Sequence, residues 1–176
     1  RLVGLGAWVW LDRLAPPTAL GITVGRVGCF LSGCDYGAPS GAWPGVAYPA
    51  WPGHLDAAGP PALLDHISHR WLPPDALASL AVHPVQLYES AWGAILLILV
   101  LRVPLARRGW RAATLALGYA WGRFWLEFLR GDADRGVGWL GSPWSQAQVM
   151  SVFVLAIGAL VATWALARRS SCPRGL

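Results

Sequence analysis

Four ionisable side chains lie inside segments that otherwise have the composition of membrane-spanning helices: Arg26, Glu89, Arg123 and Glu127. A charge near the bilayer centre costs roughly 2.5–3.5 kcal/mol on insertion scales, so such residues persist where they pair with one another or hold an oppositely charged ligand. Two arginines and two glutamates allow complete pairing. They also allow the guanidinium groups, whose planar N–H donors match phosphate, to bind an anionic headgroup. The residues alone leave both possibilities open.

The first chemical cluster is G-R-V-G-C-F-L-S-G-C-D-Y-G, from Gly25 to Gly37. Its glycines permit close approach of the backbone to a neighbouring helix or a ligand. Arg26 has no acid three or four residues away, so its partner comes from elsewhere. Cys29 is a candidate nucleophile one turn after Arg26, or simply a small buried apolar side chain. On a regular helix Cys29 and Cys34 would lie on different faces, and a disulfide would require the helix to break between them.

Two further clusters lie later in the chain. H-P-V-Q-L-Y-E, from His83 to Glu89, begins an apolar segment. Its His83 is a candidate base or a helix-capping side chain at headgroup level. Farther on, Arg123 and Glu127 are four residues apart and share a helix face, which permits an ion pair within one helix. Arg130 follows at the outer interface, where we expect its guanidinium to reach out to the headgroups.

The composition is that of a multi-pass membrane protein. Of the 176 residues, 55% are hydrophobic and 13% are charged, whereas soluble domains carry about 25% charged residues. The twelve tryptophans fit many helix ends at membrane interfaces. The fold class we expect is all-α, a polytopic transmembrane helical bundle with an irregular extracytoplasmic loop region. The net charge of +5 reflects membrane topology, and we expect no nucleic-acid partner.

The whole chain, 1–176, is expected to be a single integral membrane domain. The expected spans, each about 20 apolar residues long, are 14–33, 84–103, 112–129 and 147–167. Pro16 and Pro17 would interrupt the first of them, and Leu2–Trp10 would be the tail of a preceding helix or an interfacial piece. Because the chain begins at Arg1 in an apolar stretch, we interpret it as a fragment lacking N-terminal helices.

Arginine placement predicts the orientation. The Arg102–Arg111 connection and the C-terminal tail are arginine-rich, and basic loops remain cytoplasmic. We therefore expect a cytoplasmic C-terminus, with the 34–82 and 130–145 connections outside. In the first of these loops, His54, His66 and His69 could suggest a metal, but no further ligand stands at a metal-site spacing. We expect solvated loop histidines, no metal and no cofactor.

The three clusters, in this order, resemble the signature motifs of the prolipoprotein diacylglyceryl transferase family. In that family the motifs have the forms G-R-x-G-N-F-x-N-G-E-x-x-G, H-P-[ST]-Q-L-Y-E and R-F-x-x-E-F-x-R. The matching residues here are Gly25, Arg26, Gly28, Phe30, Gly33, Gly37, His83, Pro84, Gln86, Leu87, Tyr88, Glu89, Arg123, Phe124, Glu127, Phe128 and Arg130. Asp12, in an acid-x-x-Ala-Pro element, also looks like the family. The resemblance covers nearly the whole chain.

The resemblance implies an enzyme of the bacterial inner membrane. Its partners would be the lipid bilayer, phosphatidylglycerol and the signal peptide of a preprolipoprotein. The diacylglyceryl group would pass from phosphatidylglycerol to the lipobox cysteine thiol, forming a thioether, and glycerol-1-phosphate would leave. By the match, Arg26 would bind the headgroup, Arg123 would stabilise the leaving phosphate or position the lipid, and Glu127 would orient Arg123.

The other matched residues would support the site. Gly37 would permit close approach, and His83 with Glu89 would support the outer rim. The predicted catalytic residues are Arg123, Glu127 and His83, and the predicted substrate-binding residues are Arg26, Cys29, Gly37, Tyr88 and Glu89.

Three positions depart from the family motif. The family's two Asn residues are Cys29 and Ser32 here, and its Glu is Cys34. Asp35 could supply the missing acid, although a shift of one residue changes its direction. The family also has an upstream His-Gly-Gly element, whose His is a candidate base, and nothing in this sequence matches it.

Two other functions therefore stay open. One is a catalytically inactive membrane protein that binds or transports anionic phospholipid. The other is a structural helical subunit, which requires both intramembrane arginines to be fully paired with the two glutamates.

Overall fold

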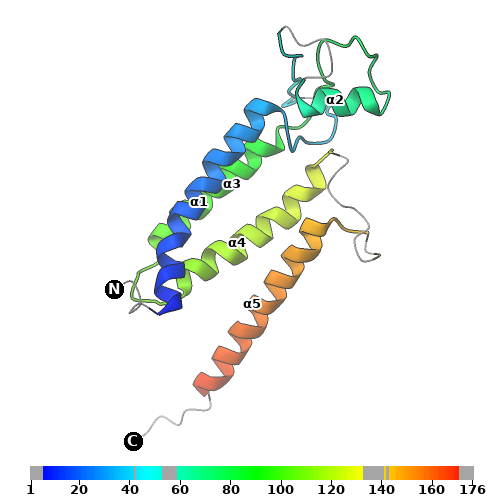
Figure 1. The fold of residues 1–176 in the computed structure, drawn as a ribbon. Coiled ribbons are helices and arrows are strands. Elements are labelled where there is room, and N and C mark those ends of the chain that lie inside the picture. Colours follow the sequence, from blue (N-terminus) through cyan, green and yellow to red (C-terminus); the bar gives the residue numbers. More distant parts are fainter. Residues whose placement is uncertain (1–5, 42, 53–58, 133–140, 142, 171–176) are drawn as a thin grey trace, which may run out of the picture.

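The computed structural model describes residues 6–41, 43–52, 59–132, 141 and 143–170, with side chains as far as Leu160 (Figure 1). These residues form helices and irregular segments, and they contain isolated β-bridges but no β-strand. The helices are α1 (Ala7–Ser32), α2 (Pro61–Ser68), α3 (Val85–Arg102), α4 (Trp110–Leu126), the 3-10 turn η1 (Glu127–Leu129) and α5 (Gln146–Ser170). The described part of the chain is thus all-helical.

Helix α1 is continuous, which corrects the expected break at Pro16 and Pro17. It runs for 26 residues through both prolines, and residues 7–10 belong to it rather than to a separate piece. A proline removes one backbone hydrogen bond and costs about 3 kcal/mol in an isolated helix. Here α1 packs along α3 and α4, and this packing maintains the helix on both sides of the prolines.

Polar contacts join the packed helices. Ser90 Oγ on α3 donates to the carbonyl of Thr23 on α1 (2.8 Å), and Trp92 Nε1 donates to the carbonyl of Gly118 on α4 (2.9 Å). Such bonds fix how neighbouring helices lie against each other in an apolar environment. Helix α5 packs beside α4 (Figure 1).

Helices α1 and α3 are long and apolar enough to cross a membrane. Only 11% of the apolar window of α1 is buried, so its large aliphatic side chains face outward, which is unlike the core helix of a soluble protein. The other two expected spans coincide with α4 and α5, and a membrane crossing by these helices stays a prediction.

Asp12 links α1 to the start of α4. Its side chain is buried, and its Oδ2 and Oδ1 accept hydrogen bonds from the amides of Gly109 (2.5 Å) and Ala112 (3.0 Å). A carboxylate at this position satisfies amides that have no partner within the helix and interacts favourably with the helix dipole. Asp12 is therefore an N-terminal cap supplied by another helix.

The segment between α1 and α3 folds over one end of the bundle. Tyr36, Tyr48, Ala62 and Val82 form its small apolar core. Gln86 on α3 connects it to the helices, since its Nε2 donates to the carbonyl of Cys34 (2.7 Å) and to Tyr48 Oη (3.2 Å). We call residues 33–84 the cap.

His66 corrects the expectation of solvated loop histidines. It is fully buried in the cap, its ring meets Tyr36 edge to face, and its Nδ1 accepts a hydrogen bond from the amide of Leu80 (3.1 Å). Burial lowers the pKa of His66, an effect that the charge of Asp65 only partly opposes. His69 is exposed as expected, and His54 lies outside the described residues.

Candidate functional site

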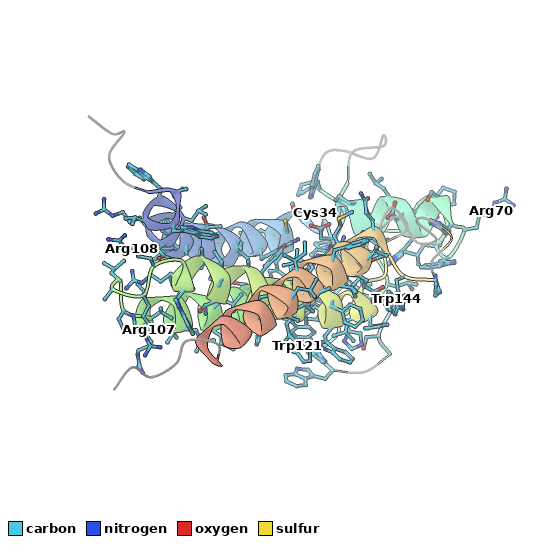
Figure 2. All side chains as sticks on the ribbon, turned by 90° about the horizontal axis from the view of Figure 1, so that it is seen from below. Cys34, Arg70, Arg107, Arg108, Trp121 and Trp144 are labelled. Carbon is cyan, nitrogen blue, oxygen red and sulfur yellow. The ribbon has the colours of Figure 1, made fainter. Side chains whose placement is uncertain are left out.

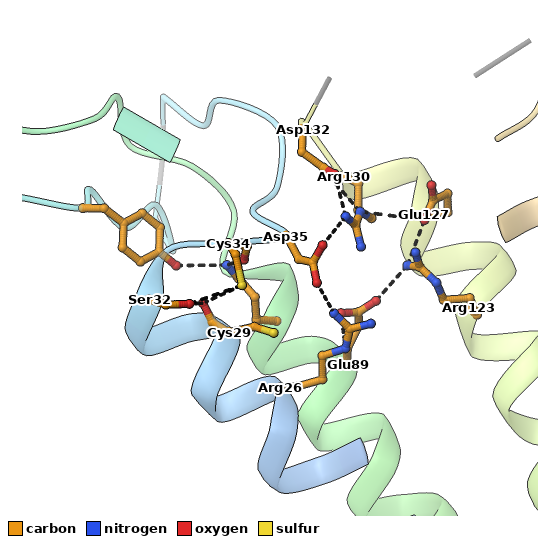
Figure 3. Close-up of polar contacts among 12 residues, drawn as sticks. Arg26, Cys29, Ser32, Cys34, Asp35, Glu89, Arg123, Glu127, Arg130 and Asp132 are labelled. Atoms are coloured by element: carbon orange, nitrogen blue, oxygen red, sulfur yellow. Dashed lines mark hydrogen bonds and ion pairs between the residues drawn. The ribbon is translucent and has the colours of Figure 1, made fainter. Parts of the chain in front are cut away.

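Seven charged side chains gather where α1, α3 and α4 meet the cap (Figure 3). They come from four separate parts of the sequence and form one network of ion pairs. We call this set the ionic cluster: Arg26, Asp35, Glu89, Arg123, Glu127, Arg130 and Asp132.

Glu89 lies between Arg26 and Arg123. Its Oε2 is 3.0 Å from Arg26 Nε, and its Oε1 is 2.8 Å from Arg123 Nη1. Arg123 Nη1 is also 2.8 Å from Glu127 Oε2, the pairing expected within one helix. Glu127 is 1% exposed, and neither of its carboxylate oxygens receives a hydrogen bond from a described residue. The Arg123–Glu127 contact is therefore an ion pair without hydrogen-bond geometry.

Asp35 holds two guanidinium groups at once. Its Oδ2 accepts a hydrogen bond from Arg26 (2.6 Å) and its Oδ1 accepts one from Arg130 (2.6 Å). Asp35 can reach inward because Gly33 and Asp35 both have left-handed backbones, with φ of 74° and 53°, a conformation that Asp tolerates better than most residues. Burial would raise the pKa of Asp35, but the two guanidinium groups outweigh it and hold the pKa below its ordinary value.

Arg130 is buried in the cluster, which corrects the expectation that it reaches out to the headgroups. Its side chain is 6% exposed and donates to both oxygens of Asp132 (2.8 and 2.6 Å). The backbone explains this direction, since the amide of Ala38 donates to the carbonyl of Leu129 (2.8 Å). Burial would lower the pKa of Arg130, but the carboxylates of Asp132 and Asp35 outweigh it and raise the pKa.

The pairing leaves some N–H donors of Arg26 and Arg123 without a hydrogen bond among the described residues. Three guanidinium groups face four carboxylates, so the cluster has no excess of positive charge when all are ionised. Among the described residues, however, Nη2 of Arg26 and Nη2 of Arg123 donate no hydrogen bond. Since a guanidinium has five N–H donors in a plane, each arginine can bind a further acceptor.

Arg26 and Arg123 both line an open hollow of about 410 Å³. The size lies in the range of small-molecule sites, roughly 300–1,000 Å³. Arg26, Arg123 and Arg130 line it together with acidic residues of the cluster, and α5 closes one side with Gln146, Ala147 and Met150. Arg26 and Arg123 therefore share one hollow, and this hollow is open to the outside.

Four of the predicted residues, Gly37, His83, Tyr88 and Cys29, are not among the residues that line this hollow. Gly37 is packed against the chain rather than against open space, because a Cβ there would lie 2.5 Å from the carbonyl oxygen of His83. His83 is half-buried, and its backbone exchanges hydrogen bonds with the backbones of Gly37 and Ala38. Its imidazole has no hydrogen bond to a described residue. Cys29 lies beside Cys34, at the end of α1.

Sequence reasoning missed several members of the site. Asp132 ends the third cluster but was given no role there, and the α5 residues Gln146 and Met150 belong to no motif that we recognised. The motif with Arg130 gave its position but not its burial. A signal for Asp132 was available, since Arg130-Gly-Asp132 places opposite charges on either side of a glycine.

Comparison with known proteins places the chain in a family. The family model described as prolipoprotein diacylglyceryl transferase matches residues 1–164. Proteins named phosphatidylglycerol–prolipoprotein diacylglyceryl transferase are similar to this chain. The one from Gloeobacter violaceus is 33% identical over 97% of this chain and 56% of its own length. The one from Acaryochloris marina is 32% identical over 98% and 56%, and the one from Clostridium tetani is 31% identical over 86% and 51%.

The chain spans about half the length of these relatives. No solved structure matches it. The family match covers almost the entire sequence, including all three motifs that contribute to the ionic cluster. The chain therefore belongs to the prolipoprotein diacylglyceryl transferase family.

Proposed function

We propose that this chain forms the phospholipid-binding part of an enzyme that transfers the diacylglyceryl group of phosphatidylglycerol to the lipobox cysteine of preprolipoproteins. The observation that supports this most directly is the open hollow shared by Arg26 and Arg123. The names of the relatives specify the same donor lipid and acceptor protein.

In this proposal the headgroup phosphate enters the hollow and takes the unused Nη2 donors. Charge-assisted hydrogen bonds from a guanidinium to phosphate are about twice as strong as neutral ones. The ion pair between Asp35 and Arg26 must weaken when the phosphate binds. Asp35 is suited to this change because its side chain is 35% exposed, the highest value among the paired acids. Glu89 and Glu127 stay in place and hold Arg123.

The transfer step forms a C–S bond and breaks a C–O bond. The cysteine sulfur attacks the glyceryl carbon that carries the phosphate, and glycerol-1-phosphate leaves with the bonding electron pair. The thiol proton passes to a base, for which His83 is the candidate on this chain. Negative charge grows on the departing phosphate, and Arg123 would stabilise it there, in the way that fixed donors stabilise developing charge in other enzymes.

We further propose a multi-pass arrangement in the bacterial inner membrane with the cap outside. Arg107 and Arg108, in the turn between α3 and α4, lie at the opposite end of the bundle from Cys34 and the cap (Figure 2). Arginine-rich turns remain cytoplasmic, which supports an extracytoplasmic cap and a cytoplasmic C-terminus. The ionic cluster would then lie at the outer side, where exported preprolipoproteins present their cysteine.

The first test is Arg26→Ala in the full-length protein that contains this chain. It is expressed in a strain depleted of its own transferase, and the mass of a reporter lipoprotein is measured. We expect loss of lipid modification with normal membrane insertion, because the headgroup loses a charged donor. Arg13→Ala is the matched control, since Arg13 lies on the same helix but is exposed. Full activity of the Arg26→Ala protein would remove the headgroup role.

A second candidate function is phospholipid binding or transport without chemistry. It is favoured by the charge balance of the ionic cluster and by Cys29 and Cys34 at positions where the family motif has Asn and Glu. Binding of phosphatidylglycerol vesicles by the full-length protein, with no thioether product on the reporter, would support this function over the transferase.

A further inference from the structure

The end of α1 brings two thiols together. Gly33 has a left-handed backbone, and the amides of Gly33 and Cys34 donate to the carbonyls of Phe30 (3.3 Å) and Cys29 (3.2 Å). This pair of bonds defines the Schellman motif, in which side chains three residues before and two residues after the last helical residue commonly touch. Those two residues are Cys29 and Cys34. They meet because the helix ends between them, so the different faces expected for a regular helix do not apply.

The geometry of the pair suits a covalent bond. Both sulfur atoms and one carboxylate oxygen of Asp35 lie within 4.8 Å of one another (Figure 3). Both cysteines are free and partly exposed. Ser32 Oγ donates to Cys34 Sγ (3.2 Å), and the Cys34 thiol is directed toward the carbonyl of Cys29 (3.7 Å). A disulfide needs a sulfur–sulfur distance of about 2.05 Å, so the two side chains must rotate toward each other before the bond can form.

A metal ion fits this place less well than a disulfide. Two thiolates and a carboxylate could in principle bind a thiophilic cation. Both oxygens of Asp35 are engaged, however, by Arg26 and Arg130 at 2.6 Å each. A cation would have to displace a guanidinium and remain beside two positive charges. A disulfide between the two cysteines would leave both ion pairs of Asp35 in place.

We propose that Cys29 and Cys34 form a reversible dithiol–disulfide site. Cys34 directly precedes Asp35, whose carboxylate pairs with Arg26 and Arg130. The oxidant is a disulfide such as glutathione disulfide. One cysteine thiolate attacks a sulfur of the oxidant, forming a mixed disulfide and releasing one glutathione thiolate. The second cysteine thiolate then attacks the cysteine sulfur of the mixed disulfide and releases the second glutathione. The chain loses two protons and two electrons, and the oxidant becomes two thiols.

The chemistry of this pair can be tested apart from lipid transfer. The full-length protein, with every cysteine except Cys29 and Cys34 replaced by serine, is purified reduced in detergent and incubated with glutathione disulfide. It is then quenched with acid and alkylated, and its peptides are identified by mass. We expect a peptide in which Cys29 and Cys34 are joined, loss of both alkylatable thiols together, and recovery of both with excess reduced glutathione.

The variants Cys29→Ser and Cys34→Ser are the matched controls, because each keeps one sulfur and should stop at a glutathione adduct. Two results would overturn the proposal: both cysteines of the parent protein remain alkylatable, or the parent stops at the same adduct as the single variants. Protection of both thiols by one equivalent of Zn²⁺, with no joined peptide under the oxidant, would also overturn it in favour of a metal site. None of these readouts measures transferase activity.

Discussion

Asp35 is the residue of the ionic cluster whose effect on phosphate binding can be tested most directly. It is the most exposed of the paired acids, and it accepts hydrogen bonds from guanidinium groups on both sides. An acid in this position either blocks an arriving phosphate or positions the arginines for it. The two roles predict opposite effects when its charge is removed.

We expect Asp35→Asn to strengthen binding of phosphatidylglycerol vesicles by the full-length protein. The carboxylate repels a phosphate that approaches Arg26, and its side chain is 35% exposed, so solvent screens part of this repulsion. The expected gain is about 1 kcal/mol, or roughly fivefold in the dissociation constant. Vesicles with and without phosphatidylglycerol, titrated against the purified protein, measure it.

Asp132→Asn is the control for this change, since Asp132 pairs with Arg130 and has no contact with Arg26. Its effect on binding should be smaller than that of Asp35→Asn. Weaker binding by the Asp35→Asn protein would show instead that Asp35 positions the arginines.

Single residues differ in how well the sequence predicts them. The charges in apolar segments had to be paired or to hold a ligand, and the structure contains both the pairs and a hollow beside them. The burial of Arg130 could not be predicted because it depends on a backbone contact between residues 38 and 129. His66 is buried by a core that only forms once the cap is folded.

At the level of helices, the length of apolar runs is a reliable guide. The predicted spans 84–103 and 147–167 differ from α3 and α5 by a few residues at their ends. The prediction failed at Pro16 and Pro17, because local propensity favoured a break while packing against α3 and α4 maintains the helix. The hydrogen bond by which Asp12 caps the N-terminus of helix α4 joins residues about 100 positions apart. Local sequence patterns contain no information about such a contact.

Helix α4 should lose stability when Asp12 is removed. Asp12→Ala leaves the amides of Gly109 and Ala112 without their acceptor, and loss of a helix cap costs about 0.5–2 kcal/mol. We expect a lower thermal unfolding midpoint of the full-length protein in detergent, followed by circular dichroism. Arg13→Ala, at the exposed neighbouring position, should leave the midpoint unchanged. Equal midpoints for both variants would contradict the capping role.

For the molecule as a whole, we expect the cap to be the part that loses stability in acid. The pKa of His66 is lowered from 6.5 by burial. The unfolded chain therefore binds a proton more readily than the folded one, and stability falls as the pH drops below about 6.5. Asp35 adds a second loss at lower pH, because its pKa is lowered from 3.8 and the stability it contributes above that value disappears as it is protonated.

The acid response is testable with two histidine variants. Unfolding midpoints of the full-length protein are compared at about pH 7.5 and about pH 5.5, the range in which a histidine changes its charge. We expect the parent and His69→Gln, whose histidine is exposed, to lose stability over this range. His66→Phe, which cannot be protonated, should lose much less. A drop of the same size in the His66→Phe protein would assign the response to another group.

The shared carboxylate of Asp35 has a consequence for how the protein would accept an arriving lipid. A phosphate that takes Arg26 away from this carboxylate leaves the hydrogen bond between Arg130 and Asp35 in place. That remaining ion pair should become stronger, because the carboxylate no longer divides its charge between two cations. Arrival of the headgroup would therefore exchange one partner of Arg26 for another without dismantling the rest of the cluster.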